Sequence, residues 1–239
     1  MNKKVFISGA AQRVGAALAR SFAEDGYDVI VHVNTSVQAG ENLIKELRIN
    51  YPKQLFNLVS INLIDWKTVG KQIKDIFSVH GYPDVIIHNA SRYDKATLLK
   101  SHPSLMEEMM AIHLFAPIEI DKVYCQHKDN GNIITLLDTA IYTNQSTHAM
   151  YLLSKKSLAE YTKMAALEWA PSIRFNGIAL GPVLPPEGKG QDYFNQVVDN
   201  TPLKEVVSVG NIKASIDFIL QNRNMTGQII NCDAGQHLV

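Results

Sequence analysis

The fold is decided by a stretch near the start of the chain, Lys4-Val5-Phe6-Ile7-Ser8-Gly9-Ala10-Ala11-Gln12-Arg13-Val14-Gly15. Residues 4–8 form a short apolar run of strand length, and a turn of small residues follows it. Over residues 14–25 apolar side chains recur at helical spacing, and Gly26 stands where a C-cap glycine is common. The stretch therefore predicts a strand, a glycine turn and a helix.

The glycine turn is a candidate phosphate-binding site. Its backbone N–H groups and the N-terminus of the following helix can face a pyrophosphate, and its small residues let the phosphates approach closely. We therefore assign Gly9, Arg13, Val14 and Gly15 to a nucleotide site. Arg13 stands where the middle glycine of the three-glycine fingerprint is common, so an ordinary tight turn between a strand and a helix is the alternative.

The second predicted strand, residues 28–33, ends without an acidic residue and runs into Asn34, Thr35 and Ser36. An Asp or Glu at this position binds the ribose hydroxyls of NAD and repels the 2′-phosphate of NADP. Its absence, with the basic Arg13 nearby in the predicted fold, favours NADP.

The alternation of strands and helices continues to the end of the chain. Further strands are predicted at 55–62, 85–89, 132–137, 174–180 and 228–232, and further helices at 37–50, 66–79, 104–127, 156–170, 191–200 and 208–221. This pattern predicts an α/β fold, a single-domain Rossmann-type doubly wound parallel β-sheet with helices on both faces, over residues 1–239. Pro117 is expected to kink the long helix 104–127.

Composition narrows the classes of function. The chain has 239 residues, of which 46% are apolar, so it can bury one large core. Its 23 basic and 23 acidic residues give no net charge, which argues against a nucleic acid or an anionic membrane surface as partner. Cys125 and Cys232 lie far apart, which suggests reduced, buried thiols and a cytoplasmic location. No stretch is typical of a signal peptide or a membrane span.

Tyr151 and Lys155 are a candidate acid–base pair. They lie four residues apart on a predicted helix, which places both side chains on one face. A positive amine beside a phenol favours the ionised form of the phenol, and such a phenol can exchange protons with a substrate. The alternative is a solvated helix edge.

Several polar residues and glycines fall at the carboxyl ends of predicted strands, where open parallel sheets bind ligands. They are Gly9, Ser36, Asn62, the stretch His88-Asn89-Ala90-Ser91-Arg92-Tyr93, Asp138 and Gly181-Pro182. The loop 181–190 is rich in Pro and Gly and leads into the predicted helix 191–200. It is either a cover over the site, as part of a substrate loop near 181–200, or a plain connecting loop.

In order and spacing these residues resemble the short-chain dehydrogenase/reductases. The resemblance covers the whole chain and rests on the turn 8–15, Asn89-Ala90, Tyr151 with Lys155, and Arg174-Phe175-Asn176-Gly177-Ile178 before the Gly-Pro loop. It implies that Tyr151 donates a proton, and that Lys155 holds the nicotinamide ribose and lowers the Tyr151 pKa. It also implies cofactor contacts from Gly9, Arg13, Val14, Gly15, Asn34, Thr35, Ser36, Asn62, Leu63, Asn89, Ala90, Ser91, Tyr151, Lys155, Gly181, Pro182 and Val183.

The chain departs from the common family pattern at Asp138. A Ser that orients the substrate carbonyl usually stands there, about thirteen residues before the Tyr. An ionised Asp only accepts hydrogen bonds, so it is a poor clamp for a ketone oxygen. In this respect the chain resembles the pteridine reductases and dihydromonapterin reductases, which also have an Arg in the glycine turn and Asn-Ala-Ser followed by an aromatic residue. That resemblance adds Asp138 to the catalytic residues and implies a substrate site of Arg13, Ser91, Tyr93, Asp138 and Tyr151, in which Tyr93 stacks on the pterin.

Two further positions differ from the family. His113 aligns with an Asn that supports a proton-relay water, so it either takes part in a relay or is a buried core histidine. Asn62 replaces an Asp and is expected to contact adenine without a charge. The histidines show no metal-ligand spacing, and we assign no metal.

The resemblance implies an NADPH-dependent reductase that transfers hydride to a dihydropterin, whether dihydromonapterin, dihydrobiopterin or dihydrofolate. It also implies a homotetramer with a small-molecule substrate as its partner. A carbonyl reductase of the same fold, acting on a ketoacyl or sugar ketone, is one alternative. A non-catalytic NADPH-binding sensor is the other, and the presence of Tyr151 and Lys155 argues against it.

Overall fold

A computed structural model describes residues 2–185, 188 and 190–239, and within this part of the chain the strands form one sheet of seven. The order is β3-β2-β1-β4-β5-β6-β7, and every neighbouring pair is parallel. The strands are β1 (Lys4–Ile7), β2 (Asp28–Val33), β3 (Phe56–Ser60), β4 (Val85–His88), β5 (Gly131–Asp138), β6 (Ile173–Leu180) and β7 (Ile229–Cys232). The predicted doubly wound parallel sheet is confirmed.

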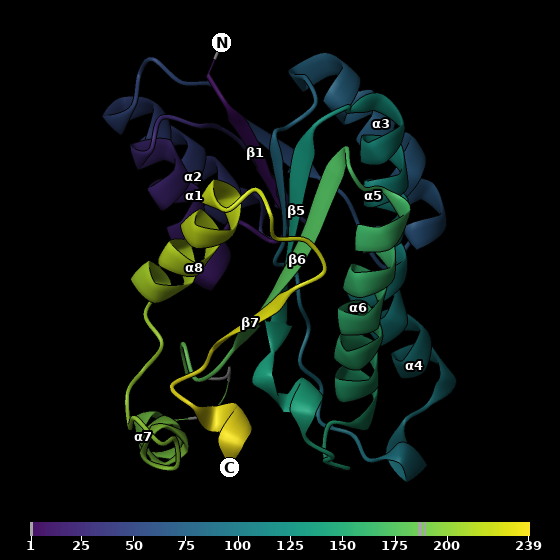
Figure 1. Ribbon diagram of the computed structural model, residues 1–239, viewed down its shortest axis with the longest axis vertical. Helices are drawn as coiled ribbons and strands as arrows, with labels where there is room; N and C mark the ends of the chain where they lie inside the picture. Colours follow the sequence, from purple (N-terminus) through teal and green to yellow (C-terminus); the bar gives the residue numbers. More distant parts are fainter. Residues whose placement is uncertain (1, 186–187, 189) are drawn as a thin grey trace.

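Helices cover both faces of the sheet (Figure 1). On one face lie α1 (Arg13–Glu24), α2 (Val37–Asn50) and α8 (Val209–Gln221), and on the other lie α3 (Trp66–His80), α5 (Ala116–His127) and α6 (Ala149–Glu168). Alternate residues of a strand point to opposite faces, so Val5 and Ile7 pack in the first cluster and Phe6 packs in the second. The core is therefore two apolar layers, one on each side of the sheet.

The order in which the strands are added to the sheet reverses at β1. This strand has β2 on one side and β4 on the other, so the connections that leave β1 and β4 diverge. A crevice between diverging connections at the carboxyl ends of the strands is where open α/β sheets bind ligands. The same end of the molecule carries α4 (Pro103–Met110) and α7 (Gln191–Asp199), and the C-terminus lies there as well (Figure 1).

The predicted helix 104–127 is divided by a π-helical segment, Ala111–Phe115. The backbone N–H of Ala116 donates to the carbonyl of Ala111, five residues earlier. Pro117 follows at the start of α5 and has no N–H to donate to the π-helical segment. The expected disturbance at Pro117 therefore takes the form of a wider turn, and His113 lies inside it.

Two other expectations can be compared with the structure. Cys125 and Cys232 are free thiols as predicted, but they are half-buried rather than buried, because both lie at the edge of the apolar layers. None of the helices described here is long and apolar enough to cross a membrane.

A buried carboxylate joins three elements beneath the end of β4. Asp121 on α5 is fully buried and accepts hydrogen bonds from His88 Nε2 at 2.8 Å and from the Tyr161 hydroxyl at 2.9 Å. An ionised carboxylate only accepts, so both partners must donate to it. The network ties α5 and α6 to the strand that leads into Asn89.

We expect Asp121→Ala to lower the free energy of unfolding by about 3 kcal/mol, because it leaves two buried donors without an acceptor. Urea unfolding followed by circular dichroism measures this loss. The matched control is Glu160→Ala, which removes the exposed ion pair with Lys163 and should cost less than about 0.5 kcal/mol. Equal losses in the two variants would show that Asp121 does not organise this part of the core.

Candidate active site

Close backbone contacts shape the glycine turn after β1. Gly9 has a φ of 64°, which favours glycine, and a Cβ added at Gly15 would lie 2.4 Å from the Gly9 carbonyl oxygen. The Asn89 side-chain amide donates to the carbonyls of Ser8 and Gly9, both at 2.9 Å. The Ser8 hydroxyl accepts from the backbone N–H groups of Asn89 and Ala90 at 3.0 Å. The turn is thus fastened to the end of β4 by Asn89 and Ala90, two residues that the sequence analysis assigned to cofactor contacts.

His32 also holds this turn, and the sequence analysis missed it. Its Nδ1 accepts from the backbone N–H of Gly9 at 3.1 Å, so its Nε2 carries the proton and donates to the Ile61 carbonyl at 3.0 Å. Burial lowers the pKa of His32 to about 4, which keeps the ring neutral. A lone His among the apolar residues of a buried strand was the available signal.

Arg13 opens α1 and reaches across the site. It has a φ of 52°, and Gln12 gives the helix no side-chain cap, so the first-turn N–H groups of α1 have no capping side chain. The Arg13 guanidinium donates to the Pro185 carbonyl at 2.9 Å, in the loop after β6. In this conformation the Arg13 guanidinium contacts the loop after β6.

The residues expected at the other phosphate lie where β2 meets α2. Asn34 and Thr35 are exposed, and Ser36 stands at the N-cap of α2 without a capping hydrogen bond from its side chain. Backbone N–H groups and hydroxyls at such a helix start can accept an anion.

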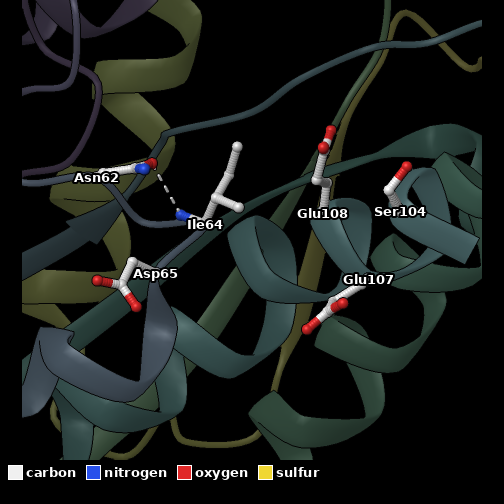
Figure 2. Close-up of a pocket in the computed structure, with 6 residues that line it drawn as sticks. All are labelled: Asn62, Ile64, Asp65, Ser104, Glu107 and Glu108. Carbon is white, nitrogen blue, oxygen red and sulfur yellow. Dashed lines mark hydrogen bonds between the residues drawn. The ribbon is translucent and has the colours of Figure 1, made fainter.

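A cavity of about 330 Å³ follows β3 (Figure 2). Asn62 lines it, and its side-chain oxygen accepts from the backbone N–H of Ile64 at 3.1 Å. Leu63, by contrast, has its side chain buried in the core, so it offers this end of the site only its backbone. The other residues that line the cavity are Ile64, Asp65, Ser104, Glu107 and Glu108.

The predicted catalytic residues meet at the ends of β5 and α6. The Tyr151 hydroxyl donates to Asp138 Oδ2 at 2.7 Å, while Asp138 Oδ1 accepts from the backbone N–H of Ala140 at 2.8 Å. Lys155 Nζ donates to the Leu136 carbonyl at 3.0 Å and lies 6.0 Å from the centre of the Tyr151 ring. Both oxygens of Asp138 are thus engaged as acceptors.

The expected lowering of the Tyr151 pKa by Lys155 is wrong for this structure. Burial raises the pKa of Tyr151 well above its usual value, and the Asp138 carboxylate adds to the increase. The negative charge at hydrogen-bonding distance outweighs the more distant ammonium. Tyr151 therefore keeps its proton at neutral pH, which suits a proton donor.

Aromatic rings build one wall of the site. Tyr93 stacks on His148 with ring centroids 4.2 Å apart and meets Tyr151 edge-on at 4.7 Å. Burial, Asp138 and Tyr193 raise the pKa of Tyr93 to about 12. The sequence analysis missed His148 and Tyr193. His148 is the N-cap residue of α6, three residues before Tyr151, and this nearness to Tyr151 in the sequence was a usable signal.

The residues after β6 form the opposite side. A Cβ at Gly181 would lie 2.6 Å from the Asp233 Cα, so Gly181 allows β6 and β7 to end close together. The Pro182 carbonyl accepts from the backbone N–H of Val207, and Val183 packs on the core. In the expected cover 181–190, Pro186, Glu187 and Lys189 lie outside the described residues.

His113 is buried under the site. It contacts Ser91 and Ser154, of which the sequence analysis named Ser91 alone. Among the described residues, no three His, Cys, Asp or Glu side chains gather in a way that could hold a metal ion.

Known proteins share this architecture. The family model for enoyl-(acyl carrier protein) reductase matches residues 9–237. The chain is 25% identical to a 3-oxoacyl-[acyl-carrier-protein] reductase of Staphylococcus epidermidis, with all of both chains covered. It is also 25% identical to a dihydromonapterin reductase of Klebsiella pneumoniae, over 99% of this chain and 97% of the relative. A crystal structure of FolM alternative dihydrofolate reductase 1 from Brucella canis, complexed with NADP, superimposes with a TM-score of 0.93 at 27% identity, covering 100% of this chain and 95% of that one.

Burial lowers the pKa of Lys155 to about 8, and the Asp138 carboxylate opposes this shift. The ammonium is therefore present below pH about 8 and is lost above it, so we expect NADPH affinity to weaken as the pH rises through that value. Fluorescence titration of NADPH binding across this range measures the change. Lys156→Ala, which removes an exposed neighbouring amine, should leave the midpoint unchanged. An affinity independent of pH would contradict a role for the Lys155 charge.

Proposed function

We propose that this chain, which belongs to the short-chain dehydrogenase/reductase family, uses NADPH to reduce a dihydropterin to the tetrahydropterin. The observation that carries the proposal is the Asp138 carboxylate, hydrogen-bonded to the Tyr151 phenol. An ionised Asp accepts hydrogen bonds and cannot donate one to a ketone oxygen. It is well suited to accept from the ring and amino N–H groups of a pterin.

Bound NADPH supplies a hydride to the carbon of a C=N bond, and one proton must then reach the nitrogen. Tyr151 holds that proton on its hydroxyl, because burial and Asp138 keep its pKa high. Asp138 orients the phenol through the 2.7 Å hydrogen bond and offers its remaining lone pairs to the substrate. Lys155 lies next to this pair and would hold the nicotinamide ribose.

Tyr93 supplies the surface on which the pterin would stack. His148 covers one face of its ring, and the residue is 52% exposed, so the exposed part of the ring can take a flat heterocycle. Stacking of this kind contributes about 0.5–1.5 kcal/mol beyond the area buried. Ser91 and Arg13 complete the proposed substrate contacts.

NADPH is the proposed cofactor for three reasons. A related protein has been crystallised with NADP, β2 ends without an acidic residue, and Asn34, Thr35 and Ser36 present polar groups at the start of α2. The glycine turn 9–15 with Asn89 and Ala90 would face the pyrophosphate. The polar cavity at Asn62 would receive the adenine.

Ketoacyl reduction is the second candidate, since the identity to a 3-oxoacyl-[acyl-carrier-protein] reductase equals that to the dihydromonapterin reductase. Asp138 supports the pterin over the ketone, because a ketone needs a donor where this chain has an acceptor. A purely NADPH-binding sensor would have no use for the buried proton donor Tyr151. We further propose that the protein works in the cytoplasm.

We expect the wild type to oxidise NADPH faster with a dihydropterin than with a ketoacyl thioester. With the same dihydropterin, it should oxidise NADPH faster than NADH. Absorbance of the reduced nicotinamide, with dihydromonapterin, dihydrobiopterin and dihydrofolate compared, measures this.

Tyr151→Phe should abolish turnover while keeping NADPH binding, and Asp138→Ser should lower pterin reduction at least about tenfold. Tyr93→Ala should raise KM for the pterin, and Arg13→Ala should reduce the preference for NADPH.

The matched control is Tyr82→Phe. Tyr82 stacks on His127 outside the site, so this substitution should leave every rate unchanged. If Asp138→Ser has no effect on dihydropterin reduction, or if the wild type prefers ketones, the carbonyl-reductase alternative replaces the proposal.

A homotetramer is the proposed assembly, and Leu153, Met164 and Leu167 leave apolar side chains exposed on α6. We expect light scattering at micromolar concentration to give four times the 26.6 kDa chain mass. Leu167→Glu should lower that mass by placing charges in an interface, whereas Leu55→Glu, an exposed leucine next to β3, should not. A monomeric wild type would overturn the assembly proposal.

A further inference from the structure

His113 is enclosed by the catalytic residues without facing the substrate. It lies in the π-helical segment Ala111–Phe115, and its side chain is 1% exposed. Its ring meets the Tyr151 ring edge-on, with centroids 5.5 Å apart. It therefore sits directly against the proposed proton donor.

The hydrogen bonds of His113 determine which nitrogen carries its proton. The backbone N–H of Arg92 lies 3.2 Å from Nε2 and can only donate, so Nε2 is an acceptor. The proton of the neutral ring is then on Nδ1, which lies 2.8 Å from the Ser154 hydroxyl oxygen. Ser154 uses its own proton for the Tyr151 carbonyl at 2.7 Å, so it is free to accept from His113. Each of these donors and acceptors is matched.

The same tautomer fixes the direction of the Ser91 hydroxyl. Ser91 Oγ lies 3.0 Å from His113 Nε2, and because Nε2 has no proton, Ser91 must donate to it. Ser91 also contacts the Tyr151 side chain, so its lone pairs are then directed to the Tyr151 phenol and the substrate. The exposed Ser91 thus presents an acceptor, as Asp138 does.

The surroundings keep the ring neutral. Burial lowers the pKa of His113 well below its usual value, and the Lys155 ammonium lowers it further. The Met109 carbonyl, which is hydrogen-bonded to the ring, opposes this shift. Other titratable or charged groups on the elements around it include Glu107 on α4, Tyr151, which keeps its proton, and Arg92, whose guanidinium pairs with Asp94 and Glu108. A neutral ring whose Nε2 already accepts two hydrogen bonds holds no proton that it could pass to Ser91.

We infer that His113 is a positioning residue, a neutral imidazole protonated on Nδ1 that joins Ser91 to Ser154, supports Tyr151 from below and leaves Ser91 as a hydrogen-bond acceptor for the substrate. This inference rests on the proposed function, because it assigns Ser91 and Asp138 together to the recognition of N–H groups. It replaces the proton relay that the family resemblance suggested for this position.

The tautomer is tested without substrate. Nitrogen-15 histidine labelling and a two-bond nitrogen–proton correlation spectrum should show the His113 ring, identified by the loss of its signal in His113→Gln, protonated on Nδ1. Its signal should stay unchanged through the pH range in which a free histidine titrates. His127 and His237 also donate from Nδ1, so the comparison with His113→Gln is needed to assign the signal. A signal for protonation on Nε2, or a ring that titrates near pH 6.5, overturns the inference. This result does not depend on which substrate the protein reduces.

The positioning role is tested by rates with whichever substrate the wild type reduces. His113→Ala should lower kcat by about tenfold to a hundredfold, the scale of a misplaced reacting group, with NADPH affinity unchanged. His113→Gln has both a carbonyl and an N–H group and should recover most of the loss. Ser91→Ala should add less than about twofold on the His113→Ala background, because the two residues act through one contact.

A relay would give different results. In mixtures of light and heavy water, the wild-type rate should fall linearly with deuterium content, because one proton moves; a curved dependence that becomes linear in His113→Gln overturns the inference. Additive effects of His113→Ala and Ser91→Ala also overturn it.

If His113→Ala does not fold, Ser91→Ala and His113→Gln decide, and an unchanged kcat in Ser91→Ala contradicts the inference. If no dihydropterin is reduced, the proposed function fails, while the tautomer result still stands or falls by itself.

Discussion

The structure depends on the hydrogen bonds that join the ends of β1 and β4. Ser8 and Asn89 lie next to each other where the strand order of the sheet reverses. Their side chains satisfy five backbone groups of the glycine turn and of the end of β4. These groups are partly buried, so a missing partner would cost about 1–3 kcal/mol each. The residues that hold the proposed phosphate site thus also satisfy the backbone of the fold itself.

The charged residues of the site are also held by hydrogen bonds to other protein atoms. Asp138 ends β5, and Lys155 on α6 reaches the same strand. Both lie near the almost fully buried phenol of Tyr151. The Lys155 amine, both Asp138 oxygens and the Tyr151 hydroxyl each have a hydrogen-bond partner in the protein. Burial acts against the charged forms of the amine and of the phenol alike. The result is an amine that titrates near pH 8 beside a phenol that stays protonated.

The sequence was sufficient for the fold and for most of the residues at the strand ends. Apolar runs and helical spacing gave each strand and most of the main helices to within a few residues. The exceptions are α6, which begins at Ala149, before the predicted run 156–170, and the predicted helix 104–127, which is divided. Asp138 and Tyr151 meet because one ends β5 and the other lies in the first turn of α6. The direction of the Tyr151 pKa shift could not be derived in this way, since it depends on the depth of burial and on which charge lies nearer. His32 and Ser154 also escaped notice, because their partners are backbone or side-chain atoms brought together only by packing.

The π-helical segment makes the length of its helix matter. A helix that bonds across five residues holds one residue more than an ordinary turn, and each residue of an α-helix turns the chain by about 100°. Removing one residue between Ala111 and Phe115 would restore regular hydrogen bonding but would rotate α4 relative to α5 by that angle. The chain therefore could not shorten here without moving either α4 or His113, whereas substitutions that keep the count leave the frame intact. In this segment length is constrained more strictly than composition.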